Sequence, residues 1–343
     1  MDPASRRRIG RTALDVTVFG FGAAPIGGFR ASISEAQAMA TVEAAAAGGV
    51  AFFDTSPFYG YGRSELRLGA ALRALPRDSF VLSTKIGRVM RPMKPGERID
   101  GLRPNGLPFA PRFDYSYDGV MRSLEHSCLR LGLNRIDIVF IHDVDMWSLR
   151  DAALLERHFA EAMDGGYRAL DELRRAGDIA AIGCGLNDAA MCARFAAAGD
   201  FDCMLLAGRY TLLEQGALAD FMPVAQSKNI AVVIGGPFNS GILTGNVGPE
   251  SKYDYAAAPP AVIARAQRLE EVCGRHGVAL AAAAIQFPLA HPAVVSVIPG
   301  ALSPAEIEAN LAHMRRPIPA ALWQELRHEG LLDPAAPLPA AGA

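Results

Sequence analysis

Four polar residues of complementary types, Asp54, Tyr59, Lys85 and His142, each lie at or just beyond the end of a short apolar run. Parallel strands that end at one rim would bring such residues together at the mouth of a dry interior, which is where the active sites of β/α barrels lie. The four side chains are therefore candidates for a single catalytic group.

The residue types indicate proton transfer. A tyrosine phenol titrates near pH ~10 in water, and a neighbouring lysine ammonium favours the phenolate. An aspartate would keep that lysine charged and in place, and a histidine could orient a substrate oxygen. The set needs neither a nucleophile nor a metal, but it contains no redox carrier, so a cofactor must supply one.

Short β-branched or apolar runs alternate with helical patterns along nearly the whole chain. Continuously apolar strands are typical of parallel sheets that are buried on both faces. The alternation allows a doubly wound sheet or a closed barrel, and eight units in one domain favour a (β/α)8 TIM barrel with long loops at its C-terminal rim. The expected strands are Val16–Gly20, Ala51–Asp54, Phe80–Lys85, Ile136–Ile141, Ile179–Gly183, Cys203–Leu206, Ile230–Ile234 and Val294–Ile298.

Three segments depart from this alternation. Residues Arg6–Asp15 could form a hairpin across the barrel floor, and the Pro-, Gly- and Arg-rich segment Ile86–Ser116 is expected to be a lid-like loop. Residues 1–332 would form a single domain. The Pro- and Ala-rich tail 333–343 is expected to be disordered.

The composition excludes several classes of protein. A formal net charge of −2 gives no general attraction to nucleic acid or anionic lipid, and no run of about 20 apolar residues predicts a membrane span. Five scattered cysteines form no CxxC pair, so we expect no metal site and no disulfide framework. These features predict a cytoplasmic protein, and they give no indication of its oligomeric state.

The segment 53–65, FDTSPFYGYGRSE, resembles the part of the aldo-keto reductase family that contains the catalytic Asp and Tyr. The runs Ser83-Thr84-Lys85 and Ile141-His142 are similar to the Lys and His strands of that family, and the resemblance extends from about Arg8 to Asn310. It implies that Tyr59 is the general acid/base, that Lys85 and Asp54 tune it, and that His142 orients the substrate oxygen.

Two glycine-containing segments, 234–243 and 298–304, follow the seventh and eighth expected strands, where phosphate sites are frequent in such barrels. The resemblance implies that they hold a nicotinamide dinucleotide. It implies these cofactor-binding residues: Asn187 at the carboxamide, Asn310 at the adenine, and Pro237, Phe238, Ser240, Gly241, Leu243, Ile298, Pro299, Gly300, Ala301 and Glu306 between them.

The choice between the two dinucleotides can be predicted from charge. Members that use NADP carry a basic residue where this chain has Gly300 and an Arg where it has Glu306, and no basic residue lies between Gly300 and Asn310. A 2′-phosphate needs a cationic partner. We therefore expect NAD, with NADP the less favoured alternative. Gly235 and Ala207 replace an aromatic and a glutamine that many members use to hold the nicotinamide, and Phe238, Arg209 or Tyr210 could compensate.

Within the family, segments 207–215 and 235–243 resemble a branch of aldose 1-dehydrogenases and pyridoxal 4-dehydrogenases. This implies oxidation of a cyclic hemiacetal to a lactone, and we expect an aldose such as L-fucose or another D-threo-aldose, with pyridoxal as the alternative. Further alternatives are a general NADPH-dependent aldehyde reductase and a non-catalytic nucleotide-sensing subunit. The predicted substrate-binding residues are Arg88, Asp145, Trp147 and Tyr210.

Overall fold

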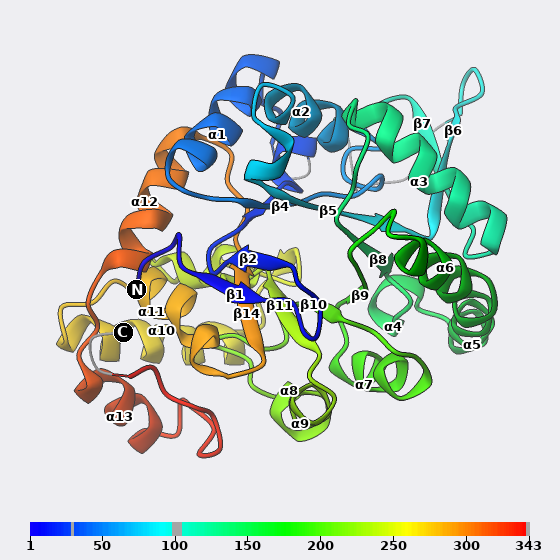
Figure 1. The fold of residues 1–343 in the computed structure, drawn as a ribbon. Coiled ribbons are helices and arrows are strands. Elements are labelled where there is room, and N and C mark those ends of the chain that lie inside the picture. The colour runs from blue at the N-terminus through cyan, green and yellow to red at the C-terminus, as the bar shows by residue number, and fades with distance from the viewer. Residues whose placement is uncertain (29–30, 98–104, 341–343) are drawn as a thin grey trace.

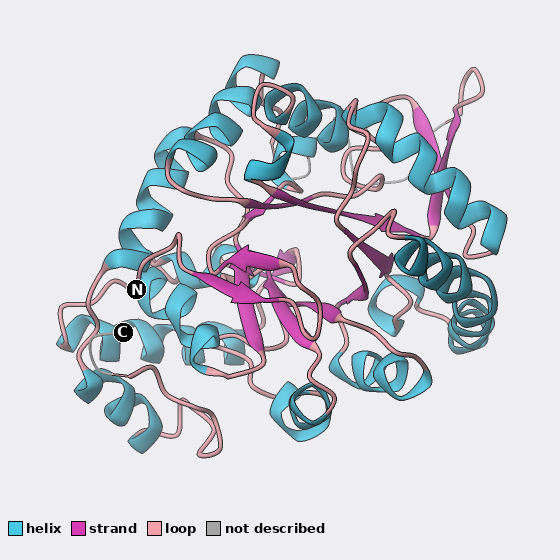
Figure 2. Ribbon diagram, viewed as in Figure 1, coloured by secondary structure: helices cyan, strands magenta, loops and turns pink. Residues whose placement is uncertain are grey.

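The computed structural model describes residues 1–28, 31–97 and 105–340. Eight parallel strands form one sheet at the centre of the fold (Figures 1 and 2). Their spatial order is β14-β11-β10-β9-β8-β5-β4-β3. The strands are β3 (Phe21–Gly22), β4 (Phe52–Asp54), β5 (Val81–Ile86), β8 (Ile138–His142), β9 (Ala181–Leu186), β10 (Cys203–Ala207), β11 (Ala231–Gly235) and β14 (Val294–Ile298).

The sheet closes on itself between the two ends of the chain. Phe19 forms a parallel bridge with Val297, and the amide of Gly22 donates to the carbonyl of Pro299 at 3.1 Å. The expected (β/α)8 barrel is confirmed.

Helices surround the barrel on its outer side (Figure 2). Helices α5 and α6 are joined by a π-helical turn, Ala162–Tyr167. The helices are α1 (Glu35–Ala47), α2 (Arg63–Leu72), α3 (Tyr117–Leu131), α4 (Met146–Leu149), α5 (Ala152–Glu161), α6 (Arg168–Ala176), α7 (Ala189–Ala198), α8 (Ala217–Asp220), α9 (Met222–Ser227), α10 (Pro260–Arg275), α11 (Leu280–Gln286), α12 (Pro304–Arg315) and α13 (Ala320–His328).

Two apolar cores hold these layers together. The larger lies between the strands and the helices, and the smaller fills the barrel interior, with Phe52 and Phe140 fully buried in it. Ile9 and Val16 also belong to the interior core, because the hairpin that carries them covers one end of the barrel (Figure 1).

That hairpin pairs β1 (Arg6–Arg8) with β2 (Asp15–Thr17) in antiparallel register, so the predicted floor hairpin is confirmed. The predicted first barrel strand, Val16–Gly20, is wrong in its bounds. The apolar run contains the end of β2 in the hairpin and leads directly into β3 (Phe21–Gly22) of the barrel, so the expected single strand is two strands.

The segment Ile86–Ser116 is more ordered than the loop that was expected. It contains an antiparallel pair, β6 (Arg88–Pro92) with β7 (Phe109–Phe113), next to the barrel rim, while residues 98–104 lie outside the described part. A second, shorter pair, β12 (Lys252–Tyr253) with β13 (Ala256–Ala257), follows β11.

The predicted disorder of the tail is wrong for residues 333–340. Ala336 is buried, its carbonyl accepts from Arg327, and the amide of Asp333 donates to Gln215. The segment also forms a turn of its own, in which the amide of Ala336 donates to the carbonyl of Asp333 at 3.0 Å. Residues 341–343 lie outside the described residues.

Candidate active site

An ion pair between two neighbouring strands forms the base of the site. Asp54 ends β4 and Lys85 lies near the end of β5, and Nζ of Lys85 donates to Oδ2 of Asp54 at 2.6 Å and to the carbonyl of Thr55 at 2.8 Å. Both side chains are almost fully buried. Because each charge has lost its water, the pair depends on these direct contacts.

Burial raises the pKa of Asp54, and the Lys85 ammonium and the Ser83 hydroxyl, which donates to Oδ1 at 2.8 Å, oppose that rise. Two donors on one carboxylate leave it little freedom to turn. The carboxylate is therefore fixed, and it holds the Lys85 ammonium in place.

Tyr59 follows β4 in a tight turn that leads into α2. Nζ of Lys85 lies 4.8 Å from the centre of the Tyr59 ring, and the His142 ring lies 5.9 Å away at an interplanar angle of 86°. An ammonium at this range stabilises a phenolate over a phenol. The four residues predicted to act together thus meet in one place.

The imidazole of His142 is held on both sides. Nδ1 lies 3.2 Å from Oγ of Ser56, and Nε2 lies 3.3 Å from Oδ1 of Asp143. The main-chain carbonyl of His142 accepts from the hydroxyl of Tyr115 at 2.6 Å, which fixes the end of β8.

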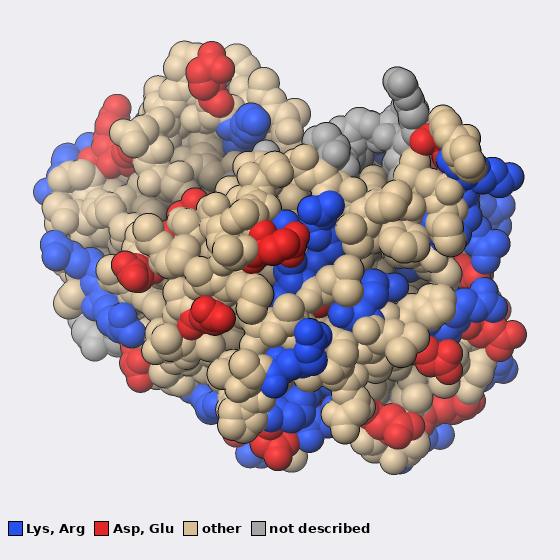
Figure 3. Space-filling view, turned by 90° about the horizontal axis from the view of Figure 1, so that it is seen from above, with Lys and Arg blue, Asp and Glu red and all other residues tan. Residues whose placement is uncertain are grey.

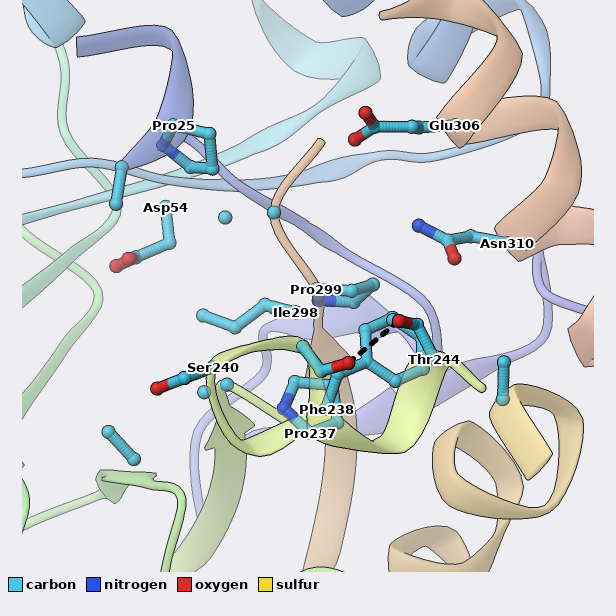
Figure 4. A pocket seen from close by; sticks show the side chains of 18 of the residues that line it. Pro25, Asp54, Pro237, Phe238, Ser240, Thr244, Ile298, Pro299, Glu306 and Asn310 are labelled. Carbon is cyan, nitrogen blue, oxygen red and sulfur yellow. Dashed lines mark hydrogen bonds between the residues drawn. The ribbon is translucent and has the colours of Figure 1, made fainter. Parts of the chain in front are cut away.

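A cleft of about 510 Å³ opens beside Tyr59 and continues across the ends of β11, β14 and α12. Figure 4 shows Glu306 and Asn310 reaching from α12 towards the cavity, opposite Pro237 and Phe238. Nine of the predicted cofactor-binding residues line it: Pro237, Phe238, Ser240, Gly241, Ile298, Pro299, Gly300, Glu306 and Asn310.

The cleft fits an elongated ligand that approaches the main chain closely. A Cβ atom on Gly300 would lie 2.5 Å from Cγ of Pro25, and one on Gly22 would lie 2.7 Å from the carbonyl oxygen of Ile298. Ser240 and Gly241 are in the left-handed region, with φ of 64° and 100°, so the main chain turns tightly along the cleft wall while the amide of Gly241 donates to the carbonyl of Phe238 at 2.9 Å. These features suit a pyrophosphate-linked dinucleotide.

The N-terminus of α12 forms one end of the cleft. Oγ of Ser303 caps the helix by accepting from the amide of Glu306 at 3.3 Å, and the Glu306 carboxylate accepts from the amide of Leu302 at 2.9 Å. Asn310 and His313 follow on the same side of the helix. Burial lowers the pKa of His313, which favours the neutral imidazole.

Three predicted cofactor residues do not line this cleft. Leu243 and Ala301 are buried in the core behind it, because the turns that carry them point the side chains inward. Asn187 lies on the catalytic side, where Nδ2 is 3.4 Å from Asp143 and 3.3 Å from Asp145.

Two predicted substrate-binding residues are wrong. Tyr210 is fully buried and packs against Phe287 and His291, with ring centres 5.7 and 5.6 Å away. Asp145 is also fully buried, where it caps α4 and accepts from the amide of Asn187 at 2.7 Å. Burial and the nearby Asp143 raise the pKa of Asp145.

The other two predicted substrate-binding residues lie at the rim. The Arg88 guanidinium donates to Asp143 at 2.7 Å and is buried. Trp147 is 36% exposed, and its ring centre lies 5.8 Å from that of Tyr255, which lines the cleft. Trp147 and Tyr255 thus form a pair of aromatic side chains at the entrance of the cleft.

Several cleft residues were not predicted. Gly22 ends the first barrel strand and Ala24 and Pro25 follow it, so placing that strand correctly would have pointed to them, because active-site residues lie at the ends of barrel strands. Leu205 lies on β10, and Gly236, Thr244, Tyr255, Ala281, Ala309 and His313 lie on helices, turns or the β12–β13 hairpin; none of these carries a motif of its own.

Within the described ranges, no three His, Cys, Asp or Glu side chains are placed to hold a metal ion, and no helix has the length and apolarity to cross a bilayer. On the face in Figure 3, acidic and basic side chains are interspersed.

The aldo/keto reductase family model matches residues 18–328, and the chain belongs to that family. Pyridoxal 4-dehydrogenase of Microbacterium luteolum is 45% identical over 340 residues, which cover 96% of this chain and 98% of that protein. D-threo-aldose 1-dehydrogenase of a Pseudomonas species is 37% identical over 326 residues, which cover 93% and 95%. The chain is thus an oxidoreductase of the dehydrogenase branch that its motifs indicated, and it uses a nicotinamide cofactor.

Solved structures agree on the fold. An aldo-keto reductase from Bacillus halodurans superimposes with a TM-score of 0.73 at 21% identity, covering 97% of both chains. A glycerol dehydrogenase from Gluconobacter oxydans gives a TM-score of 0.72 at 20% identity, covering 99% of this chain and 98% of that one.

Proposed function

We propose that the protein oxidises a cyclic hemiacetal to its lactone with NAD. The observation that carries the proposal is the buried Lys85–Asp54 pair beside the Tyr59 ring, at the mouth of a dinucleotide-sized cleft. A nicotinamide dinucleotide held in the cleft between Pro237, Gly300 and Asn310 would supply the acceptor for the hydride of the hemiacetal carbon. Tyr59, as phenolate, takes the hydroxyl proton, and His142 orients the oxygen while the C–O bond becomes a carbonyl.

For the substrate, we now favour a planar heteroaromatic hemiacetal of the pyridoxal type over a sugar. Polar side chains near the rim that could bind sugar hydroxyls are engaged elsewhere: Asp145 caps a helix, and Arg209 forms a bidentate ion pair with Asp254 at 3.0 and 2.8 Å. The residues that remain at the mouth, Trp147 and Tyr255, offer aromatic faces. The relative that is 45% identical is a pyridoxal 4-dehydrogenase.

An aldose lactol is the second candidate, because the 37% identical relative is an aldose 1-dehydrogenase and an aromatic face also suits the apolar side of a sugar ring. The two are separated by incubating the enzyme and NAD with pyridoxal or with free aldoses, including L-fucose. NADH release with identification of 4-pyridoxolactone supports the first candidate, and aldonolactone supports the second. No NADH from any of them would refute the dehydrogenase proposal and favour the nucleotide-sensing alternative.

The preference for NAD rests on Glu306. Its carboxylate lies in the cleft near Gly300, and Arg316, which could have reached back, donates instead to the carbonyl of Gly277 at 3.4 Å. A 2′-phosphate near Glu306 would be repelled. We expect Glu306→Arg to lower the Kd for NADPH by about tenfold or more, as in pairings of Arg with phosphate. An unchanged ratio of NADPH to NADH affinity would show that other residues select the cofactor.

A further inference from the structure

A buried ion pair that belongs to neither the catalytic tetrad nor the cleft lies directly behind His142. Arg88 begins β6 and Asp143 follows β8, and Nη1 of Arg88 lies 2.7 Å from Oδ2 of Asp143. The guanidinium also lies between two aromatic rings, 4.0 Å from the centre of Phe58 and 4.5 Å from that of Phe113. These contacts fix Arg88 in one orientation, because a planar cation between two rings cannot turn without losing both.

The second oxygen of the same carboxylate reaches two residues of the site. Oδ1 of Asp143 lies 3.3 Å from Nε2 of His142 and 3.4 Å from Nδ2 of Asn187. Asp143 adopts a left-handed conformation with φ of 57°, which is uncommon for a residue other than glycine. That conformation is retained where surrounding contacts determine it, and here Arg88, His142 and Asn187 contact the side chain while the amide of Asp143 donates to the carbonyl of Gly185 at 3.0 Å.

The Asp143 carboxylate also determines where the proton of His142 lies. The contact of Oδ1 of Asp143 with Nε2 of His142 at 3.3 Å is a charge contact and not an aligned hydrogen bond, and because the carboxylate would repel a lone pair on Nε2, a protonated Nε2 is favoured. Oγ of Ser56 accepts from the amide of Phe58 at 3.1 Å, and its own proton can then go to Nδ1 of His142 at 3.2 Å. The neutral ring is thereby held as the Nε2–H tautomer.

We propose that Arg88 and Asp143 are positioning residues of this dehydrogenase: the ion pair holds the Asp143 carboxylate against the edge of the His142 ring and so favours the Nε2–H tautomer, whose proton is directed to the substrate oxygen because the contact with Asp143 is not an aligned hydrogen bond. The proposal rests on the role given to His142 in the proposed function. Arg88 was a predicted substrate-binding residue, and its contacts assign it this indirect role instead. By balancing the charge of Asp143, Arg88 lets the carboxylate act as an acceptor without a net negative charge beside the reacting oxygen.

The test compares Asp143→Asn, Arg88→Met and the double variant. Asparagine keeps the size of Asp143 and tolerates its left-handed backbone. We expect Asp143→Asn to lower kcat by about 10- to 100-fold, the scale for outer partners that orient a histidine, while the KM for substrate changes less than about threefold. The double variant removes both buried charges, so its Tm should recover towards the wild-type value while kcat stays low.

Recovery of kcat together with Tm in the double variant would overturn the proposal, because the pair would then matter only for stability. A matched control is the buried pair of Arg77 and Asp137, with Nη2 and Oδ2 2.6 Å apart at the opposite end of β8. Asp137→Asn should lower Tm and leave kcat unchanged. An equal loss of kcat in this control would also refute the positioning role.

A second measurement needs no substrate, so it separates this proposal from the proposed function. Nitrogen-15 spectra of histidine-labelled protein report which ring nitrogen carries the proton, and the His142 signals are assigned by their loss in His142→Gln. We expect protonated Nε2 in the wild type and a mixture of tautomers in Asp143→Asn. Identical spectra would refute the proposal even if the wild type were active. The expected spectra in an enzyme without turnover would refute the proposed function alone.

Discussion

The sharpest test of the catalytic group is Tyr59→Phe, because the substitution removes one hydroxyl and keeps every ring contact. The Lys85 ammonium 4.8 Å from the ring centre and the His142 ring 5.9 Å away both remain in place. Loss of a positioned acid/base costs about 10²- to 10⁴-fold in rate, which corresponds to about 2.7–5.5 kcal/mol in the barrier. A hydroxyl hydrogen bond contributes only about 0.5–1.5 kcal/mol to folding, so Tm should change little.

The assay has two parts. Steady-state NADH formation gives kcat, and titration of the intrinsic fluorescence with NADH gives the cofactor Kd. We expect kcat to fall by two to four orders of magnitude at an unchanged Kd. Tyr61→Phe is the matched control, since Tyr61 is buried two residues away and packs on Phe58 with ring centres 6.2 Å apart. A kcat within tenfold of the wild-type value in Tyr59→Phe, or an equal loss in Tyr61→Phe, would refute the role given to Tyr59.

Three further substitutions test the parts around this tyrosine. Lys85→Met should lower kcat by at least about 100-fold and, by breaking a buried pair, lower the free energy of unfolding by about 3–5 kcal/mol. Because burial raises the pKa of Asp54, the lone carboxyl takes up a proton as the pH falls, so the loss of stability in urea unfolding should be smaller at pH 5 than at pH 8; an equal loss at both values would contradict the assignment. Gly300→Ala places a Cβ 2.5 Å from Pro25 and should weaken NADH binding about tenfold, by an overpacking cost of about 1–3 kcal/mol; unchanged calorimetric affinity would show that the loop yields freely. Ser303→Ala removes the cap of α12 and should cost about 1 kcal/mol of unfolding free energy, and no measurable change would mean that Glu306 alone holds the helix start.

The sequence predicted the catalytic group because one physical rule determines it. Asp54, Lys85 and His142 end adjacent parallel strands, and apolar runs of this kind can be located in a sequence. Tyr59 follows the first of them within a short turn. Register between the strands then brings the side chains together without any information about distant parts of the chain.

The same rule failed where the direction of a side chain matters. Asp145 and Tyr210 both follow barrel strands, but one turns inward to cap α4 and the other packs under Phe287. A strand end determines that a residue lies at the rim, whereas the local turn determines where its side chain points. Neither turn had a recognisable pattern.

The hairpin of β6 and β7 was not predicted because each strand contains a proline, which a sequence pattern assigns to loops. In the structure both strands lie outside the barrel sheet, where a missing amide is tolerated. The tail was misjudged for a similar reason: its composition predicts disorder, but its contacts with Arg327 and Gln215 come from elements that no local pattern connects to it.

The bridge between Phe19 and Val297 also determines when the protein becomes functional. Asp54, Tyr59 and Lys85 come from the first third of the chain and the dinucleotide cleft largely from its last third, so the cofactor site is incomplete until the final strand of a nascent polypeptide has emerged and docked. Ligand binding would then hold the first and last barrel strands, β3 and β14, together. Resistance to proteolysis should therefore increase most at these two strands.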